Sequence, residues 1–177
     1  MTRTTTVSMT DRVEQIRTED LPPLEAQMDE IRAEADENYN DVWDIPDKME
    51  ERYKSLKDQA KNLRGEIETL EHYIEEYGGD EFTIRELSVG GVGKIQDDVA
   101  EASNANFQGE GTPKGGYARN RTLEVALVDS PPRAPEPSDM ADTVGDWLFD
   151  CIDEFNTTGQ VSLGNSSLRA DLMKSEN

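Results

Sequence analysis

The stretch of this sequence that looks most like a chemical site is glycine-rich: Ser88-Val-Gly-Gly-Val-Gly-Lys94-Ile95. A phosphate-binding loop needs a glycine six residues before its lysine and a serine or threonine directly after it. Here those two positions are Ser88 and Ile95, and no buried apolar strand precedes the stretch. We therefore interpret it as the start of a helix that is capped by Ser88 and packs closely on a neighbour.

The residues that commonly bind metals or act as nucleophiles are scattered along the chain. His72 is the only histidine, and it falls two residues after the apolar position Leu70, off the apolar face of its helix. Cys151 is the only cysteine and lies beside Trp147 and Ile152, which indicates a small core residue rather than a nucleophile. Because metal sites need several convergent ligands, we expect no metal, no cofactor and no enzyme.

A short basic and aromatic cluster, Tyr117-Ala-Arg119-Asn-Arg121, stands out in an acidic chain. One interpretation is a contact with an acidic partner or with nucleic acid. The other is that the two arginines form local salt bridges, which is the more common use of such residues.

Charge excludes some partners. The 177 residues include 39 acidic and 18 basic side chains, for a formal charge of −21. Binding to nucleic acid or to an anionic membrane requires a cationic face, so we expect neither partner. The acid is dispersed, and lysine is scarcer than arginine, which favours a proteome adapted to molar salt, where charge repulsion is screened within ~3 Å. The alternative is an ordinary acidic coiled-coil protein.

The element that organises the chain is a pair of heptad-patterned helices in residues 21–77. Apolar residues repeat there with alternating spacings of three and four, which is typical of a narrow seam between two helices. The second helix carries Met49, Tyr53, Leu56, Ala60, Leu63, Ile67, Leu70, Ile74 and Tyr77 at these spacings, and the first carries Leu21, Leu24, Met28, Ile31, Ala35, Asn38 and Val42. The short connection predicts an antiparallel coiled-coil hairpin in a mainly α fold.

The second helix of this hairpin is longer than the first, which we expect to end near Trp43. Its last turns need another cover: residues 11–20, the second half of the chain, or another copy. If the seam joins subunits or a partner, the interaction residues are Leu63, Ile67, Leu70 and Ile74, with Tyr39 and Trp43 near the hairpin tip. The alternative is a hairpin that closes on itself.

The remaining chain divides into three parts. Residues 1–20 are predicted to be a polar lead-in followed by a short helix from Asp11, capped by Thr10. Residues 82–156 form a small helical head domain of three helices, preceded by a strand or extended segment at 82–87. Residues 157–177 form a polar C-terminal tail. The N-terminus lacks an apolar run, so we expect no signal peptide and a cytoplasmic protein.

The second half resembles tail-assembly proteins of tailed viruses and proviruses of haloarchaea. The resemblance rests on four segments: Phe82-Thr-Ile-Arg-Glu-Leu-Ser-Val, Lys94-Ile-Gln-Asp-Asp-Val, Leu123-Glu-Val-Ala-Leu-Val-Asp-Ser-Pro-Pro and Val144-Gly-Asp-Trp-Leu-Phe-Asp. An apolar helix with a proline stop, followed by an amphipathic helix, is similar to small helical tail-assembly chaperones. The long hairpin departs from those compact proteins.

This resemblance implies a non-enzymatic protein of viral tail assembly, or a component of the virion. Its partners would be other tail or neck proteins and further copies of itself, in the cytoplasm of a haloarchaeal host or in the virion. The alternative is a cellular coiled-coil chaperone or adaptor, similar to prefoldin-like hairpins. Prefoldin subunits place β-hairpins between their long helices, whereas here the two helices are consecutive.

Overall fold

The computed structural model describes residues 2–39, 45–107 and 114–158. The expected mainly helical class is confirmed, but the described residues also contain a three-stranded sheet that the prediction of a helical head omitted. The chain divides into two compact units, residues 8–75 and residues 1–7 with 76–177. The first seven residues therefore group with the second half of the chain rather than with the helices that follow them.

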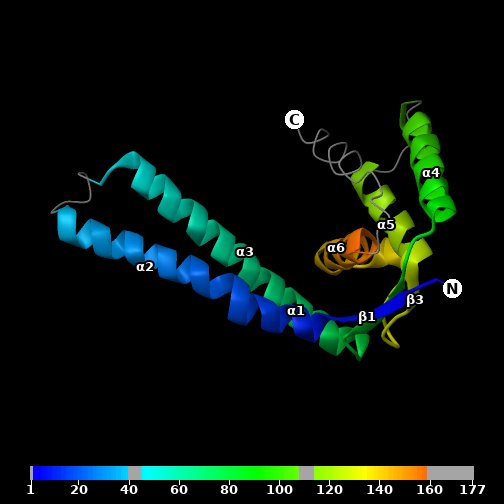
Figure 1. The fold of residues 1–177 in the computed structure, drawn as a ribbon, viewed down its shortest axis with the longest axis horizontal. Helices are drawn as coiled ribbons and strands as arrows, with labels where there is room; N and C mark the ends of the chain where they lie inside the picture. Colours follow the sequence, from blue (N-terminus) through cyan, green and yellow to red (C-terminus); the bar gives the residue numbers. More distant parts are fainter. Residues whose placement is uncertain (1, 40–44, 108–113, 159–177) are drawn as a thin grey trace. The chain divides into compact units, whose positions relative to one another are not determined.

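The first unit is a pair of antiparallel helical segments (Figure 1). One segment joins α1 (Met9–Gln15), a π-helical turn η1 (Ile16–Asp20) and α2 (Leu21–Asn38), and the other is α3 (Asp47–Tyr77) up to Glu75. Arg17 bonds Glu71 near the end of α3, whereas Gln27 accepts a hydrogen bond from Arg52 near its start. Residues later in the first segment thus contact residues earlier in α3, as an antiparallel arrangement requires. We call this unit the helix pair.

The predicted apolar seam is the buried line of the helix pair. On α3, Leu56, Ala60, Ile67 and Leu70 are buried, and the other seam positions up to Glu75 are half-buried. The last seam residue, Tyr77, is also buried but belongs to the second unit. On the facing segment, Leu21, Met28 and Ile31 are buried. The burial pattern therefore follows the heptad prediction, except at Asn38, which is exposed, and the predicted seam residue Val42 lies outside the described residues.

The seam continues into the N-terminal segment through a shift of one residue. Met9, Val13 and Ile16 are buried at spacings of four and three, and the next seam residue, Leu21, follows after five. The π-turn accounts for this extra residue, because the Leu21 N–H bonds the Ile16 carbonyl five residues back. The wider turn returns Leu21 to the face used by Ile16.

The same π-turn accommodates Pro22 and Pro23, which occupy the first turn of α2. A proline inside a regular α-helix lacks a donor for the carbonyl four residues back, and its ring collides with that carbonyl. A stretch of i+5 hydrogen bonds just before the prolines relaxes this constraint. The prolines therefore follow a local change in helical hydrogen bonding, and the helical segment continues through them.

Several predicted helix ends shift. The first helix begins at Met9, and its cap is Ser8, whose hydroxyl accepts from the Asp11 N–H at 3.3 Å, rather than Thr10. The first helix of the predicted hairpin, α2, ends at Asn38 rather than near Trp43, because Tyr39 is already extended. The predicted end of α3 is confirmed: Gly78, at φ +72°, takes the left-handed conformation that glycine favours at a helix end.

The second unit contains the sheet, with strand order β1-β2-β3. β1 (Thr4–Ser8) replaces the expected polar lead-in, because three consecutive threonines and a valine favour a strand. β2 (Glu81–Arg85) confirms the predicted strand, with Phe82 and Ile84 buried and their neighbours more exposed. β3 (Leu127–Asp129) runs antiparallel to β2.

Three helices complete this unit: α4 (Val89–Phe107), α5 (Lys114–Ala126) and α6 (Asp142–Thr158), with a short 3₁₀ turn η3 (Pro137–Asp139). α5 contacts α4, α6 and η3. An apolar stripe on α6 forms core, with Val144, Trp147, Leu148 and Ile152 buried, and Phe82 meets Trp147 edge-on at 6.1 Å.

A buried asparagine ties the end of β2 to α6. Asn156 is 2% exposed. Its Oδ1 accepts from the Leu87 N–H at 2.8 Å, and its Nδ2 donates to the Ile152 carbonyl at 2.6 Å. Asn156 was not predicted to be a core residue, because its polar type placed it outside the apolar residues of the helix.

The π-turn makes a testable prediction. Deletion of Thr18 together with Pro22→Ala and Pro23→Ala makes the seam spacing a continuous 3,4 repeat, so the helix pair should fold with an unchanged or higher Tm. Deletion of the exposed Ala26 with the same two substitutions rotates Met28 and Ile31 off the seam. The free energy of unfolding should then fall by about 1.5–3 kcal/mol for each of these two side chains. Thermal unfolding followed by circular dichroism compares the two, and equal Tm losses would contradict the account.

The Asn156 contact predicts a second outcome. Asn156→Leu leaves the buried Leu87 N–H without its acceptor, and the free energy of unfolding should fall by about 1–3 kcal/mol. The neighbouring exposed Thr157→Val is the matched control and should change it by less than about 0.5 kcal/mol. Denaturant unfolding measures both variants, and equal stabilities would show that the asparagine is not a structural tie.

Candidate interaction surfaces

The predicted interaction residues lie mostly inside the helix pair. Ile67 and Leu70 are buried, at 7% and 0% exposure. Leu63, Ile74 and Tyr39 are half-buried. Contact of the two buried residues with another chain would require the helix pair to open, and Trp43 lies outside the described residues.

The N-terminal segment runs beside the last turns of α3. Arg12 bonds Glu66 at 2.9 Å and Asp20 at 2.9 Å, and Arg17 bonds Glu71 at 2.7 Å. The sequence left three possibilities for what covers the last turns of α3. The structure places residues 11–20, which follow the buried Met9, in contact with this part of the helix.

The polar contacts also define the two flanks of the helix pair. Arg64 bonds Glu25 at 2.6 Å on one flank. Lys57 lies seven residues before Arg64, which is two helical turns, so it projects on this same flank. Lys54 and Lys61 are its neighbours at i−3 and i+4, and all three lysines are exposed. We call these three residues the lysine row.

The other flank carries a matching row of acid. Gln27 accepts a hydrogen bond from Arg52 at 3.3 Å there, and Glu34 lies seven residues after Gln27. Glu30 and Glu37 adjoin Glu34 at i−4 and i+3, and all three side chains are exposed. We call these the glutamate row.

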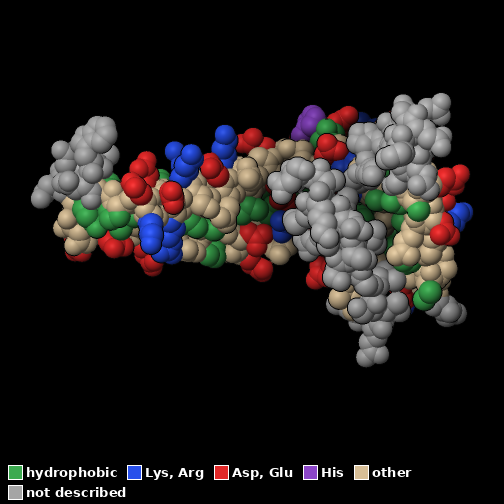
Figure 2. Space-filling view, turned by 90° about the horizontal axis from the view of Figure 1, so that it is seen from above, with side chains coloured by type: hydrophobic (Ala, Val, Ile, Leu, Met, Phe, Trp, Pro, Cys, Tyr) green, Lys and Arg blue, Asp and Glu red, His purple; other side chains and the backbone are tan. Residues whose placement is uncertain are grey.

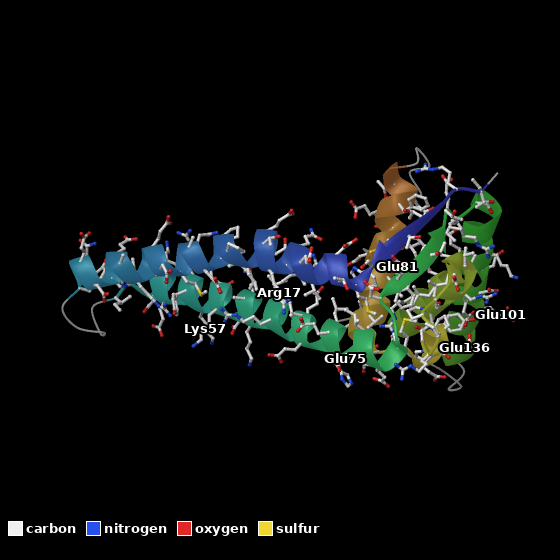
Figure 3. The ribbon with its side chains drawn as sticks, turned by 90° about the horizontal axis from the view of Figure 1, so that it is seen from below. Arg17, Lys57, Glu75, Glu81, Glu101 and Glu136 are labelled. Carbon is white, nitrogen blue, oxygen red and sulfur yellow. The ribbon has the colours of Figure 1, made fainter. Side chains whose placement is uncertain are left out.

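The two helices differ in charge as well as in position. α2 carries six acidic side chains and one basic, whereas residues 48–64 of α3 carry six basic and three acidic. Four of the seven lysines in the chain fall in that part of α3. Figure 3 labels Lys57 on α3, and Figure 2 shows acidic and basic side chains along the visible face of the helix pair.

The two rows differ from four arginines of the helix pair in their ion pairing. Arg12, Arg17, Arg32 and Arg64 all pair with carboxylates of the same unit. Within the described ranges, no ion pair joins the lysine row or the glutamate row to another side chain. The 3,4 spacing of both rows is present in the sequence, but the predicted interaction residues were all apolar or aromatic and included neither row.

The predicted basic cluster on α5 forms local salt bridges. Arg119 is 14% exposed and its Nη1 lies 2.9 Å from carboxylates of both Asp142 and Asp146. Arg121 bonds Asp98 on α4 and Glu124 on its own helix, each at 2.6 Å. The second of the two interpretations is thus the one that the contacts support.

These contacts set the ionisation of Arg119. Partial burial lowers the pKa of Arg119, but hydrogen bonds and charges from Asp146 and Asp142 outweigh it, so the pKa is raised above its ordinary value. Gly145 leaves room for the guanidinium, because a Cβ at that position would lie 3.2 Å from its Cζ. Arg119 therefore fastens α5 to the first turns of α6 as a permanent cation.

The glycine-rich stretch starts α4, as interpreted. The Ser88 hydroxyl accepts from the Gly91 N–H at 3.0 Å, which confirms the cap. A Cβ on Gly91 would meet Val125 at 3.8 Å, so the helix start approaches α5 here. In this first part of α4, the Val89 side chain is 73% exposed, whereas Ile95 is 4% exposed.

The remaining candidates are placed as follows. His72 is exposed, 5.1 Å from the Tyr73 ring, and Cys151 is half-buried. Groups of three or more potential metal ligands are absent from the described ranges. In those ranges no helix has both the length and the hydropathy needed to cross a membrane.

A shallow groove of about 390 Å³ runs beside the edge strand β3 in the second unit. Its lining includes the carboxylates Glu124, Asp129 and Glu136, with Val128 54% exposed. A bulge at Val128 interrupts the pairing of β3 with β2. Bulged and acidic edges resist strand addition, so this edge is poorly suited to bind an extended partner.

Comparison with known proteins leaves the geometry as the main evidence. No protein-family model, no curated protein and no solved structure matches this chain.

The Arg119 contacts predict that Arg119→Met destabilises the second unit by about 1–2 kcal/mol, since it removes two ion pairs from a largely buried site. Arg119→Lys keeps the charge on a shorter donor set and should lose less. Thermal unfolding of both variants measures this order. Equal loss in the two would show that packing rather than charge fastens α5 to α6.

Proposed function

We propose that this protein acts by protein–protein contacts, as an assembly or structural component of a virus tail in a high-salt host. The observation that carries the proposal is the surface of the helix pair. The pair fills most of its seam from a single chain and presents charged rows on both flanks. Such a unit offers long, regular surfaces to other proteins. The four segments that resemble haloarchaeal tail proteins support the viral assignment.

We further propose that the helix pair is a left-handed coiled coil. The 3,4 burial pattern and the antiparallel polar contacts support this geometry. A rigid coiled coil would hold its two flanks at a fixed separation. Fixed surfaces of this kind suit repeated assembly, where each subunit must present the same contact.

The high-salt host is supported by the charge of the chain. A formal charge of −21 in 177 residues repels itself in dilute buffer. At molar salt the screening length falls to ~3 Å, and the repulsion is largely removed.

This part of the proposal predicts that the protein is stabilised by salt. Raising NaCl from 0.15 M to 2–3 M should raise Tm by roughly 4–8 °C, which corresponds to about 2 kcal/mol for a chain of this size. Replacing Glu30, Glu34 and Glu37 by glutamine lowers the repulsion and should reduce the salt dependence. A Tm that is unchanged or lowered by salt would contradict the halophilic assignment.

The viral role is tested in a haloarchaeal host that carries the gene in a provirus. Deletion of the gene should give particles without complete tails, and complementation in trans should restore them, as seen by electron microscopy. Mass spectrometry of purified particles then separates a structural component, which is retained, from an assembly chaperone, which is not. Normal tailed particles after deletion would instead favour the cellular chaperone or adaptor.

A further inference from the structure

We propose that copies of this chain associate side by side, with the lysine row of one copy (Lys54, Lys57 and Lys61) against the glutamate row of the next (Glu30, Glu34 and Glu37). The occupant of the lysine flank is thus a second copy of the same chain. This inference deepens the proposed function, because it names the surface through which copies would assemble.

The two rows are complementary in charge. Both rows are exposed, and within the described ranges neither is joined by ion pairs to its own chain. The lysine row is a local cationic surface in a chain of formal charge −21. Its best partner is therefore acidic, and the opposite flank of the same molecule supplies a carboxylate row of equal length.

The spacings of the lysine row and the glutamate row also match. The lysines are spaced three then four residues apart, and the glutamates four then three. Laid antiparallel, Lys61 meets Glu30, Lys57 meets Glu34 and Lys54 meets Glu37. The residue numbers of all three pairs add to the same total, as an antiparallel register requires. Each row spans seven residues, about 10 Å along its helix.

The contact also fixes the relative direction of the two copies. α2 and α3 are antiparallel within one chain, so an antiparallel contact between α3 of one copy and α2 of the next makes the two copies parallel. Unlike surfaces on opposite flanks form a heterologous contact, which repeats into a closed ring or an open array.

Salt does not remove this contact. Charged groups that touch at hydrogen-bonding distance lie within the ~3 Å screening length of molar salt. Screening removes the long-range attraction between copies. At contact, opposite charges are still favoured over like charges, which repel each other.

The test is charge reversal in the full-length chain. One variant carries Lys54→Glu, Lys57→Glu and Lys61→Glu, and the other carries Glu30→Lys, Glu34→Lys and Glu37→Lys. Sedimentation equilibrium in 0.15 M and 2 M NaCl should show the wild type associating, and each variant alone associating about tenfold or more weakly. An equimolar mixture of the two variants should assemble again, because each now offers what the other lacks.

Lys48→Glu with Lys94→Glu is the matched control, with two reversals outside both rows, and should assemble like the wild type. Circular dichroism of each variant confirms that its helices remain folded before it is scored. A monomeric wild type, unchanged assembly in both row variants, or no co-assembly in the mixture would overturn the proposal. These measurements use purified protein and are independent of the gene-deletion test. The copies could fail to associate while tail assembly still requires the gene, or could associate although tails form without it.

Discussion

The phase of the apolar seam is the constraint on which the helix pair depends. A heptad pattern keeps its apolar residues on one face only while the spacing stays at three and four. Between Ile16 and Leu21 the spacing is five, and a regular helix would turn everything before it away from α3. The π-turn absorbs the extra residue, so Met9, Val13 and Ile16 are buried on the same line as Leu21.

The outer surface follows from this phase. Once the seam is fixed, every residue seven positions from a flanking contact is placed on a known flank. The Arg64–Glu25 pair thereby places Lys57, and the Arg52–Gln27 contact places Glu34. The charge rows are therefore consequences of the same spacing that packs the core. A shift of one residue in either helix would move both the core and the rows.

Much of the helix pair could be predicted from sequence, because burial along α3 repeats with the heptad period. The N-terminal part could not, since the single extra residue disguised Met9 to Ile16 as a separate helix. β1 was missed because its threonines are polar, and its strand preference counts only when β2 is beside it. Asn156 shows the same limit, because its value comes from a Leu87 N–H far away in the sequence.

The most direct test of the account is a zero-length carbodiimide cross-link between the two rows. Equal amounts of ¹⁴N-labelled and ¹⁵N-labelled protein are mixed, cross-linked at 2 M NaCl, and analysed by mass spectrometry. The account predicts a Glu34–Lys57 cross-link between peptides of different label, since it joins two copies. Cross-links confined to peptides of one label would contradict it, because the rows would then meet only within a chain.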